Sequence, residues 1–216
     1  MGGSSQSRRI VGMGGFPDRA VWEHVLALAG GPRVLVDRTA SPQAADPVEL
    51  AGELTDLRFF PWPPAGLREL ALGSDVILVC GGNTANMLAV WRRHGFDRIL
   101  REAWEAGVVL AGWSAGMICW FEAGVTDSFG PQLEGMRDGL GFLPGSACPH
   151  YDGEELRRPV YTGLVANGFP AGIALDDGAA AHYAGDELVE VLAAAPDARG
   201  YHVGPDGEVP LPVRLL

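Results

Sequence analysis

Two runs that contain only apolar residues, 76–79 and 108–111, constrain the fold of this 216-residue chain more than any other feature. Each run has the length of a strand and no polar alternation, which indicates a strand buried on both faces. Each ends in a glycine-containing turn that leads into a helical pattern. Residues 10–13 and 34–36 form further strand-like runs, separated by a helical stretch. Because alternating strands and helices build βαβ units, we expect an α/β fold with a mostly parallel sheet covered by helices on both faces.

The remaining periodicity predicts further elements on both sides of these runs. The expected helices cover residues 18–29, 46–54, 83–94, 97–106 and 154–167, and the expected strands cover residues 57–60, 172–175, 179–183, 188–193 and 201–203. Turn residues separate the last four strands, so we expect antiparallel hairpins on one edge of the sheet. The prolines at 61–64 predict a loop. We expect one domain over residues 1–216, with residues 1–8 as a flexible tail.

The composition excludes several classes of partner. A net charge of −11 and a pI near 4.8 argue against binding to nucleic acid or to anionic membranes. No apolar run approaches the ~20 residues that span a bilayer, and no secretory signal is evident. The three cysteines form no C-x-x-C pair, which predicts free thiols in a reducing cytoplasm. No histidine, cysteine and acidic residues share a metal-ligand spacing, so we expect no metal site.

A Gly-x-Ser-x-Gly motif follows the second apolar run, as Gly-Trp-Ser-Ala-Gly at 112–116. A sharp strand-to-helix turn presents a serine hydroxyl, here that of Ser114, and requires small residues on both sides. The N–H of Ala115 can then face an oxyanion. A plain tight turn is the alternative, since 31 of the 216 residues are glycine. The preceding strand favours a nucleophile.

A serine nucleophile needs a general base, and five histidines are available. His24 and His94 lie in helical stretches, His182 lies in a strand-like run, and His202 is near the C-terminus. We expect structural roles for these four. His150 instead lies in a turn-rich loop, the kind of segment in which α/β proteins place catalytic groups.

The carboxylate that would orient the base has three candidates. Asp176 and Asp177 follow the expected strand 172–175, where an acidic pair before glycine is also ordinary turn chemistry. Asp127 is the rival, and it would give the order Ser, Asp, His. Spacing alone leaves this choice open. Cys148 lies two residues before His150 and could border the same site, whereas Cys80 and Cys119 lie in apolar stretches that indicate the core.

A second glycine pair lies at the end of the first apolar run, in Gly81-Gly82-Asn83-Thr84. It lacks the spacing and the lysine of a phosphate-binding loop. Asn83 or Thr84 can cap the following helix, and a backbone N–H here could complete an oxyanion hole with Ala115. The first glycine loop, residues 12–15, indicates a plain strand-to-helix turn.

Together these motifs resemble the peptidase E and cyanophycinase family of serine peptidases. The resemblance rests on the loop at 81–84, the motif at 112–116, the pair Pro149–His150 and the step Asp177–Gly178, in this order over about residues 75–180. It implies a flavodoxin-like three-layer α/β sandwich, related to class I glutamine amidotransferases. It also implies a cytoplasmic serine exopeptidase that forms an acyl-enzyme and needs no cofactor.

The resemblance also implies a role for each residue. The implied set is Ser114 as nucleophile, His150 as base, Asp177 as third triad member with Asp176 still possible, the N–H groups of Gly82 and Ala115 as oxyanion hole, and Asn83 and Asp127 as supporting residues. Peptidase E has a glutamate at the step that Asp177 occupies here, which is a departure from the family pattern.

The substrate is less constrained than the chemistry. Peptidase E cleaves dipeptides with an N-terminal aspartate, and a relative that binds a C-terminal carboxylate would be a carboxypeptidase. Arg157 and Arg158 are candidates for pairing either carboxylate. Two alternatives remain, a serine esterase or amidase and a non-catalytic binding module. Family members often associate, so we expect a homodimer or a higher homo-oligomer that acts on short peptides.

Overall fold

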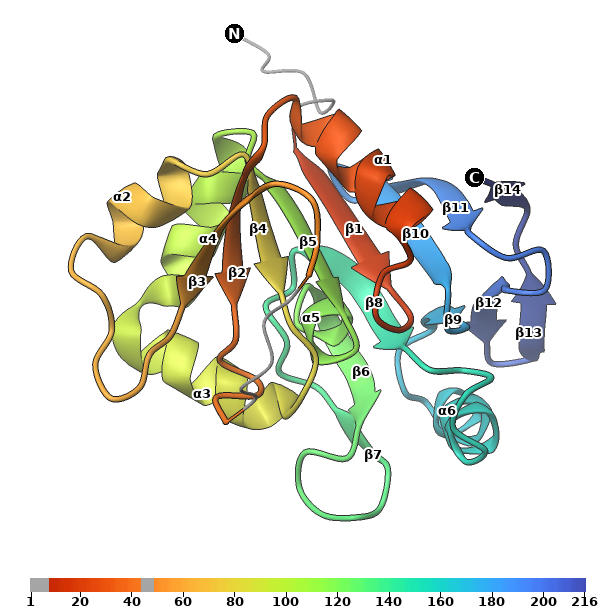
Figure 1. The fold of residues 1–216 in the computed structure, drawn as a ribbon. Coiled ribbons are helices and arrows are strands. Elements are labelled where there is room, and N and C mark those ends of the chain that lie inside the picture. Colours follow the sequence, from red (N-terminus) through yellow and green to blue (C-terminus); the bar gives the residue numbers. More distant parts are fainter. Residues whose placement is uncertain (1–7, 44–48) are drawn as a thin grey trace, which may run out of the picture.

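The structure, a computed structural model, describes residues 8–43 and 49–216 as a mixed α/β fold with two sheets (Figure 1). In chain order the elements are β1 (Arg9–Met13), α1 (Arg19–Ala29), β2 (Arg33–Asp37), β3 (Glu53–Leu57), α2 (Leu67–Leu72), β4 (Val76–Val79), α3 (Thr84–His94), α4 (Phe96–Glu105), β5 (Val109–Trp113), α5 (Ala115–Ile118), β6 (Phe121–Thr126), β7 (Glu134–Met136), β8 (Leu143–Cys148), α6 (Arg157–Ala166), β9 (Gly172–Leu175), β10 (Ala179–Ala184), β11 (Glu187–Ala193), β12 (Gly200–Gly204), β13 (Gly207–Pro210) and β14 (Val213–Leu215).

The larger sheet has eight strands in the order β14-β11-β10-β1-β5-β4-β2-β3. From β1 to β3 all neighbouring strands are parallel. β10 pairs antiparallel with β1, and β11 pairs antiparallel with β10. The predicted parallel sheet with antiparallel strands toward the C-terminus is therefore present. Its carboxyl edge collects the turns that follow β1, β4 and β5.

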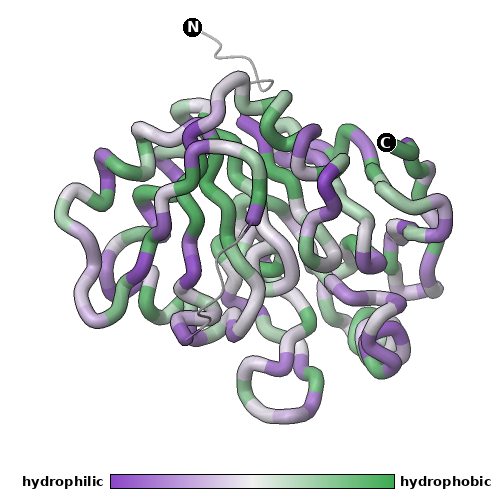
Figure 2. The backbone as a smooth tube through the Cα atoms, in the orientation of Figure 1, coloured by the Kyte–Doolittle hydropathy of each residue, from purple (hydrophilic) through white to green (hydrophobic). Residues whose placement is uncertain are grey.

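Helices cover both faces of this sheet. Alternate residues of the central strands divide between two apolar clusters: Val11, Val36 and Leu78 pack with α1, whereas Ile10 and Ile77 pack with α3 and α4. This alternation produces strands that are apolar throughout, and the apolar residues follow the centre of the sheet in Figure 2. Burial on both faces explains why the runs at 76–79 and 108–111 identify strands so clearly.

A second sheet of six strands, in the order β13-β12-β9-β8-β6-β7, corrects one expectation. The predicted strands 172–175 and 201–203 pair with each other, and they lie in this sheet rather than on the edge of the first one. Two of its central strands, β6 and β8, were not predicted. Gly124, Pro144 and Gly145 interrupt their apolar pattern, and glycine and proline weaken a strand signal.

The segment before residue 61 corrects a second expectation. Of the predicted helix 46–54, residues 46–48 lie outside the described residues. Residues 53–57 form β3, which pairs in parallel with β2. The predicted strand 57–60 is wrong except at Leu57, the last residue of β3. Four of the five β3 residues are exposed, so pairing with β2 forms this strand without any apolar pattern in its sequence.

Several smaller expectations concern the ends and connections. α1, α3, α4 and α6 match predicted positions to within a few residues, whereas α2 was not predicted. Residues 1–7 of the predicted tail lie outside the described residues. Within the described ranges, no helix combines the length and the apolar character needed to cross a membrane.

Candidate active site

Ser114 lies at the turn between β5 and α5, in a backbone conformation that few L-residues adopt. Its φ is 55° and its ψ is −115°. A Cβ on Gly112 would lie 2.4 Å from the Gly116 carbonyl oxygen, and one on Gly116 would lie 2.1 Å from the Val79 carbonyl oxygen. Both glycines are thus required by close backbone approach, which is why the motif needs small residues around its serine.

His150 shares this unusual conformation, with φ 52°. Across residues 8–43 and 49–216, Ser114 and His150 are the two non-glycine residues with positive φ. Such conformations cost free energy and tend to persist where the surrounding structure enforces them, often at functional sites.

One short segment at the end of β1 anchors both residues. The N–H of Ser114 donates to the Met13 carbonyl oxygen at 3.3 Å, and the N–H of His150 donates to the Gly14 carbonyl oxygen at 3.2 Å. The carbonyls of the last residue of β1 and of the residue after it therefore fix both backbones. The two residues lie at the carboxyl edge of the parallel strands, the usual place for ligands in such sheets.

The imidazole of His150 pairs with Asp177. His150 Nδ1 lies 2.7 Å from Asp177 Oδ1. The backbone N–H of Asp177 donates to Asp152 Oδ1 at 2.8 Å, which ties the turn after β9 to the His150 loop. This pairing leaves the opposite ring nitrogen, Nε2, as the one available to a serine hydroxyl or a substrate.

Two glycines enclose the Asp177 carboxylate. A Cβ on Gly15 would lie 2.3 Å from Asp177 Oδ1, and one on Gly153 would lie 2.5 Å from Oδ2. A Cβ on Gly14 would lie 2.1 Å from the Asp176 carbonyl oxygen. Residues 12–15 are thus more than the plain turn that the sequence indicated. The signal for their role was the pair of adjacent glycines directly after β1.

The other two carboxylate candidates lie differently. Asp176 is 4% exposed and accepts a hydrogen bond from the N–H of Arg199 at 2.9 Å. Burial, reinforced by the nearby Asp152 carboxylate, raises the pKa of Asp176 to about 6. Asp127 is exposed in the loop after β6. Of the three candidates, Asp177 is the one hydrogen-bonded to His150.

The Gly81–Gly82 loop borders the serine. A Cβ on Gly81 would lie 3.1 Å from Ser114 Cβ, so this backbone touches the serine side chain. Gly82 has φ 137°, a value that favours glycine. Within the described residues, no acceptor pairs with the backbone N–H of Gly82 or of Ala115. Among the described residues both donors are therefore unpaired, that of Ala115 directly after Ser114 and that of Gly82 in the neighbouring loop after β4.

Asn83 has a structural position in the same loop. It caps α3, since its Oδ1 accepts a hydrogen bond from the Asn86 N–H at 2.8 Å. Its Nδ2 donates to the Ser128 carbonyl oxygen at 2.9 Å, which ties the loop after β6 to the start of α3. Asp127 belongs to that loop, and so it borders the site without entering the hydrogen-bonded group.

The two candidate arginines differ in availability. The Arg157 side chain is 4% exposed, with hydrogen bonds to both Glu154 carboxylate oxygens and to the Val125 carbonyl oxygen. Arg158 is 48% exposed and pairs with Glu208. Its guanidinium also lies 5.2 Å from the ring centre of Tyr151, the residue after His150. Of the two, only Arg158 presents an exposed guanidinium.

Cys148 does not border the site. It is fully buried, and burial raises the pKa of its thiol to about 12. Cys80 and Cys119 are buried free thiols as well, as expected.

The expectation that no residues could hold a metal needs correction, because His24, His182 and Glu190 come together from three elements. Their sequence separation hid this group.

Comparison with known proteins identifies the family. The profile of Peptidase family S51 matches residues 47–191, which include Ser114, His150 and Asp177. The chain belongs to peptidase family S51. It is therefore a serine-type peptidase, a hydrolase, and the resemblance to the peptidase E family is confirmed.

Individual relatives agree with this S51 assignment. The chain is 50% identical over 165 residues to "Uncharacterized peptidase YgaJ" of Bacillus subtilis (strain 168), which covers 74% of this chain and 71% of that protein. A putative peptidase E protein from Listeria monocytogenes EGD-e superposes with a TM-score of 0.64 at 17% identity, covering 87% of this chain and 99% of that one. A peptidase from an acI-B1 Actinobacterium gives 0.67 at 17% identity, covering 95% and 94%. These two structures share the fold.

Proposed function

We propose that this S51 peptidase is an exopeptidase for short peptides that uses Ser114, His150 and Asp177 as a catalytic triad. One observation carries the proposal. The two strained non-glycine residues are anchored on the consecutive carbonyls of Met13 and Gly14, at the end of β1, and His150 is hydrogen-bonded to the Asp177 carboxylate. In serine peptidases a carboxylate orients the histidine in this way, and the histidine accepts the proton of the serine.

The reaction follows from these positions. His150 Nε2 accepts the hydroxyl proton as Ser114 Oγ attacks the peptide carbonyl, and the N–H groups of Gly82 and Ala115 stabilise the oxyanion. His150 then donates that proton to the leaving amine, and an acyl-enzyme remains. Water attacks the ester, again with His150 as base, and releases the acid. Asp177 holds the Nδ1–H throughout and stabilises the imidazolium.

A preference for short peptides is supported by the loops around Ser114. Residues 40–41 contact Gly82, and Ser128 is hydrogen-bonded to Asn83, so separate segments enclose the Gly81–Gly82 loop. Both the aspartyl dipeptidase and the carboxypeptidase alternatives require a cation for a substrate carboxylate. We assign that role to Arg158, because Arg157 is buried and fully engaged, whereas Arg158 is exposed and can exchange its pairing with Glu208 for a substrate carboxylate.

We also propose the flavodoxin-like fold, a single domain over residues 1–216 and a homo-oligomeric state. The strand order β3-β2-β4-β5 supports the first, because it repeats the first four positions of the flavodoxin-like order 2-1-3-4-5; the fifth position is taken by β1, the first strand of this chain. We retain the cytoplasm as the proposed location.

A peptide panel tests the proposed function. It contains Asp-Xaa dipeptides and blocked peptides with either terminus free, and mass spectrometry follows the released amino acids. We expect Ser114→Ala to abolish release, whereas Ser74→Ala, at the end of α2, retains it. Release from Asp-Xaa alone identifies an aspartyl dipeptidase, and release from N-blocked peptides identifies a carboxypeptidase. Hydrolysis that persists in Ser114→Ala, or none by the wild type, contradicts the proposal.

A further inference from the structure

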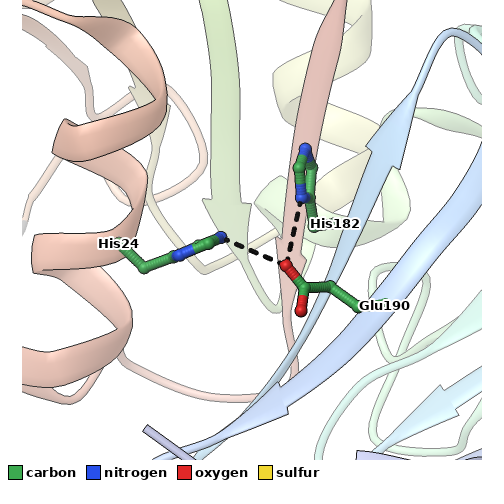
Figure 3. A group of neighbouring side chains, drawn as sticks. All are labelled: His24, His182 and Glu190. Atoms are coloured by element: carbon green, nitrogen blue, oxygen red, sulfur yellow. Dashed lines mark ion pairs between the residues drawn. The ribbon is translucent and has the colours of Figure 1, made fainter. Parts of the chain in front are cut away.

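A group of metal-ligating side chains lies apart from the proposed triad, between α1 and the strand pair β10–β11. It consists of His24 on α1, His182 on β10 and Glu190 on β11 (Figure 3). His24 Nε2 lies 3.8 Å from Glu190 Oε1, and His182 Nδ1 lies 3.7 Å from the same oxygen. The two ring nitrogens and this oxygen all lie within 4.8 Å of one another.

The two imidazoles lack ordinary partners. The His182 side chain is 8% exposed. Among the described residues, no hydrogen bond reaches His24 Nε2 or either ring nitrogen of His182. Distances of 3.7 and 3.8 Å to Glu190 exceed a hydrogen bond. Buried polar atoms are normally paired, so these nitrogens call for a ligand between them and the carboxylate.

The spacing fits a small cation. Tetrahedral zinc, with bonds of about 2.0–2.2 Å, holds its ligand atoms about 3.4 Å apart. The two separations from Glu190 Oε1, 3.8 and 3.7 Å, need only a slight contraction to reach this value, and the two histidine side chains, which lie with it within 4.8 Å, would have to move toward each other as the ion binds. Two imidazoles and one carboxylate are a donor set that zinc accepts, with water as the fourth ligand.

The surroundings prepare these groups as ligands. Arg214 Nε donates to Glu190 Oε2 at 2.7 Å, which leaves Oε1 directed at the two histidines. Burial of His24 Nε2 and of both His182 ring nitrogens, without hydrogen-bond partners among the described residues, leaves them free to bind an ion. Outer partners of this kind commonly orient metal ligands.

We propose that His24, His182 and Glu190 form a site for a divalent transition-metal ion, with zinc as the fitting member. The ion would link α1 to the β10–β11 pair. α1 follows Gly15 in the chain and β10 follows Asp177, and Gly15 lies against the Asp177 carboxylate. The metal site therefore joins the two elements that follow this contact. The role is structural, and it is independent of the proposed exopeptidase chemistry.

The test measures metal binding by the whole chain after treatment with EDTA. Zinc is added in equilibrium dialysis, and cobalt is added as a spectroscopic probe. We expect one zinc ion per chain, a cobalt visible spectrum typical of a four-coordinate site, and a zinc-dependent rise in Tm. His24→Gln and Glu190→Gln should each weaken binding by about 100-fold or more, and Arg214→Gln by about 10-fold.

His202→Gln is the matched control, because His202 is exposed on β12 and should bind metal like the wild type. Circular dichroism confirms that each variant is folded, and Glu190→Gln, on a partly exposed residue, suffices if a histidine variant fails to fold. Absence of saturable zinc binding overturns the proposal. Binding that Glu190→Gln leaves unchanged also overturns it, since the ion then lies elsewhere.

Discussion

At the scale of single residues, three carboxylates compete for one role, and hydrogen bonding separates them. Asp177 is hydrogen-bonded to His150, Asp176 is buried and accepts a hydrogen bond from the Arg199 backbone, and Asp127 is exposed in the loop after β6. Spacing alone could not make this choice, because residues 176 and 177 are adjacent and differ in which way each side chain points; the family resemblance favoured Asp177.

Asp177→Asn tests the assignment directly. An amide at this position cannot stabilise the imidazolium and favours the wrong tautomer, so kcat should fall by about 10³–10⁴-fold. Asp127→Asn should change kcat by less than about tenfold, because its side chain lies outside the hydrogen-bonded group. Steady-state kinetics on the best peptide of the panel provides the measurement. Equal losses in the two variants would refute the triad.

A buried carboxylate away from the triad predicts a pH dependence of stability. Asp37 is fully buried, and its Oδ2 accepts a hydrogen bond from Trp91 Nε1 at 2.7 Å. Burial raises its pKa from 3.8 to about 6. A raised pKa means that the folded protein holds the proton more tightly. The resulting stabilisation is complete below pH 3.8 and is lost as the pH rises through 6.

We therefore expect the stability advantage of the wild type over Asp37→Asn to shrink between pH 4 and pH 7, by about 2 kcal/mol. Urea unfolding of both proteins at each pH gives the difference in unfolding free energy. Comparison with the variant removes the effect of the other ionisable groups. An advantage that grows over this range would contradict the assignment.

At the scale of elements, the end of β1 and the loop that leads to α1 hold the parts of the site together. The carbonyls of Met13 and Gly14 accept hydrogen bonds from Ser114 and His150, and Gly15 lies against the Asp177 carboxylate. The loop contributes no chemistry, but it brings together three turns that are distant in the sequence. This arrangement requires a backbone without side chains at 14 and 15.

Gly15→Ala tests that requirement. The new methyl group would lie 2.3 Å from Asp177 Oδ1 and must displace the carboxylate, so we expect kcat to fall by at least about 100-fold. Gly163→Ala is the control, because nothing lies within 4 Å of its position in α6. That change should leave kcat intact and raise the unfolding free energy by about 0.5–1 kcal/mol. Full activity of Gly15→Ala would contradict the proposed support.

At the scale of the whole molecule, the sequence predicted the central strands of the first sheet well, but it missed β3 at the edge of that sheet and β6 and β8 in the second sheet. The strands that are buried on both faces carry short runs of apolar residues, which identified them as strands. The glycines of residues 112–116 identified the turn that follows β5. β3 is almost fully exposed, and β6 and β8 contain glycine and proline, so pairing rather than pattern defines them. His24, His182 and Glu190 converge only through the tertiary fold.

The candidate site also contains residues that a local sequence pattern predicts and residues that only the fold brings together. Ser114 and His150 lie in turns with recognisable sequences, and they could be predicted. Asp152, Gly15 and Gly153 act through contacts between separate loops, and no local spacing reveals such contacts. Local chemistry was therefore predictable, whereas the supporting contacts required the structure.

Covalent labelling tests the central claim most directly. The intact wild-type protein is treated with a fluorophosphonate, and peptide mass spectrometry locates the adduct. We expect one adduct, on Ser114, that forms much more slowly in Asp177→Asn and is absent in Ser114→Ala. An adduct on another serine, or no adduct on a folded protein, would contradict the assignment of Ser114 as the nucleophile.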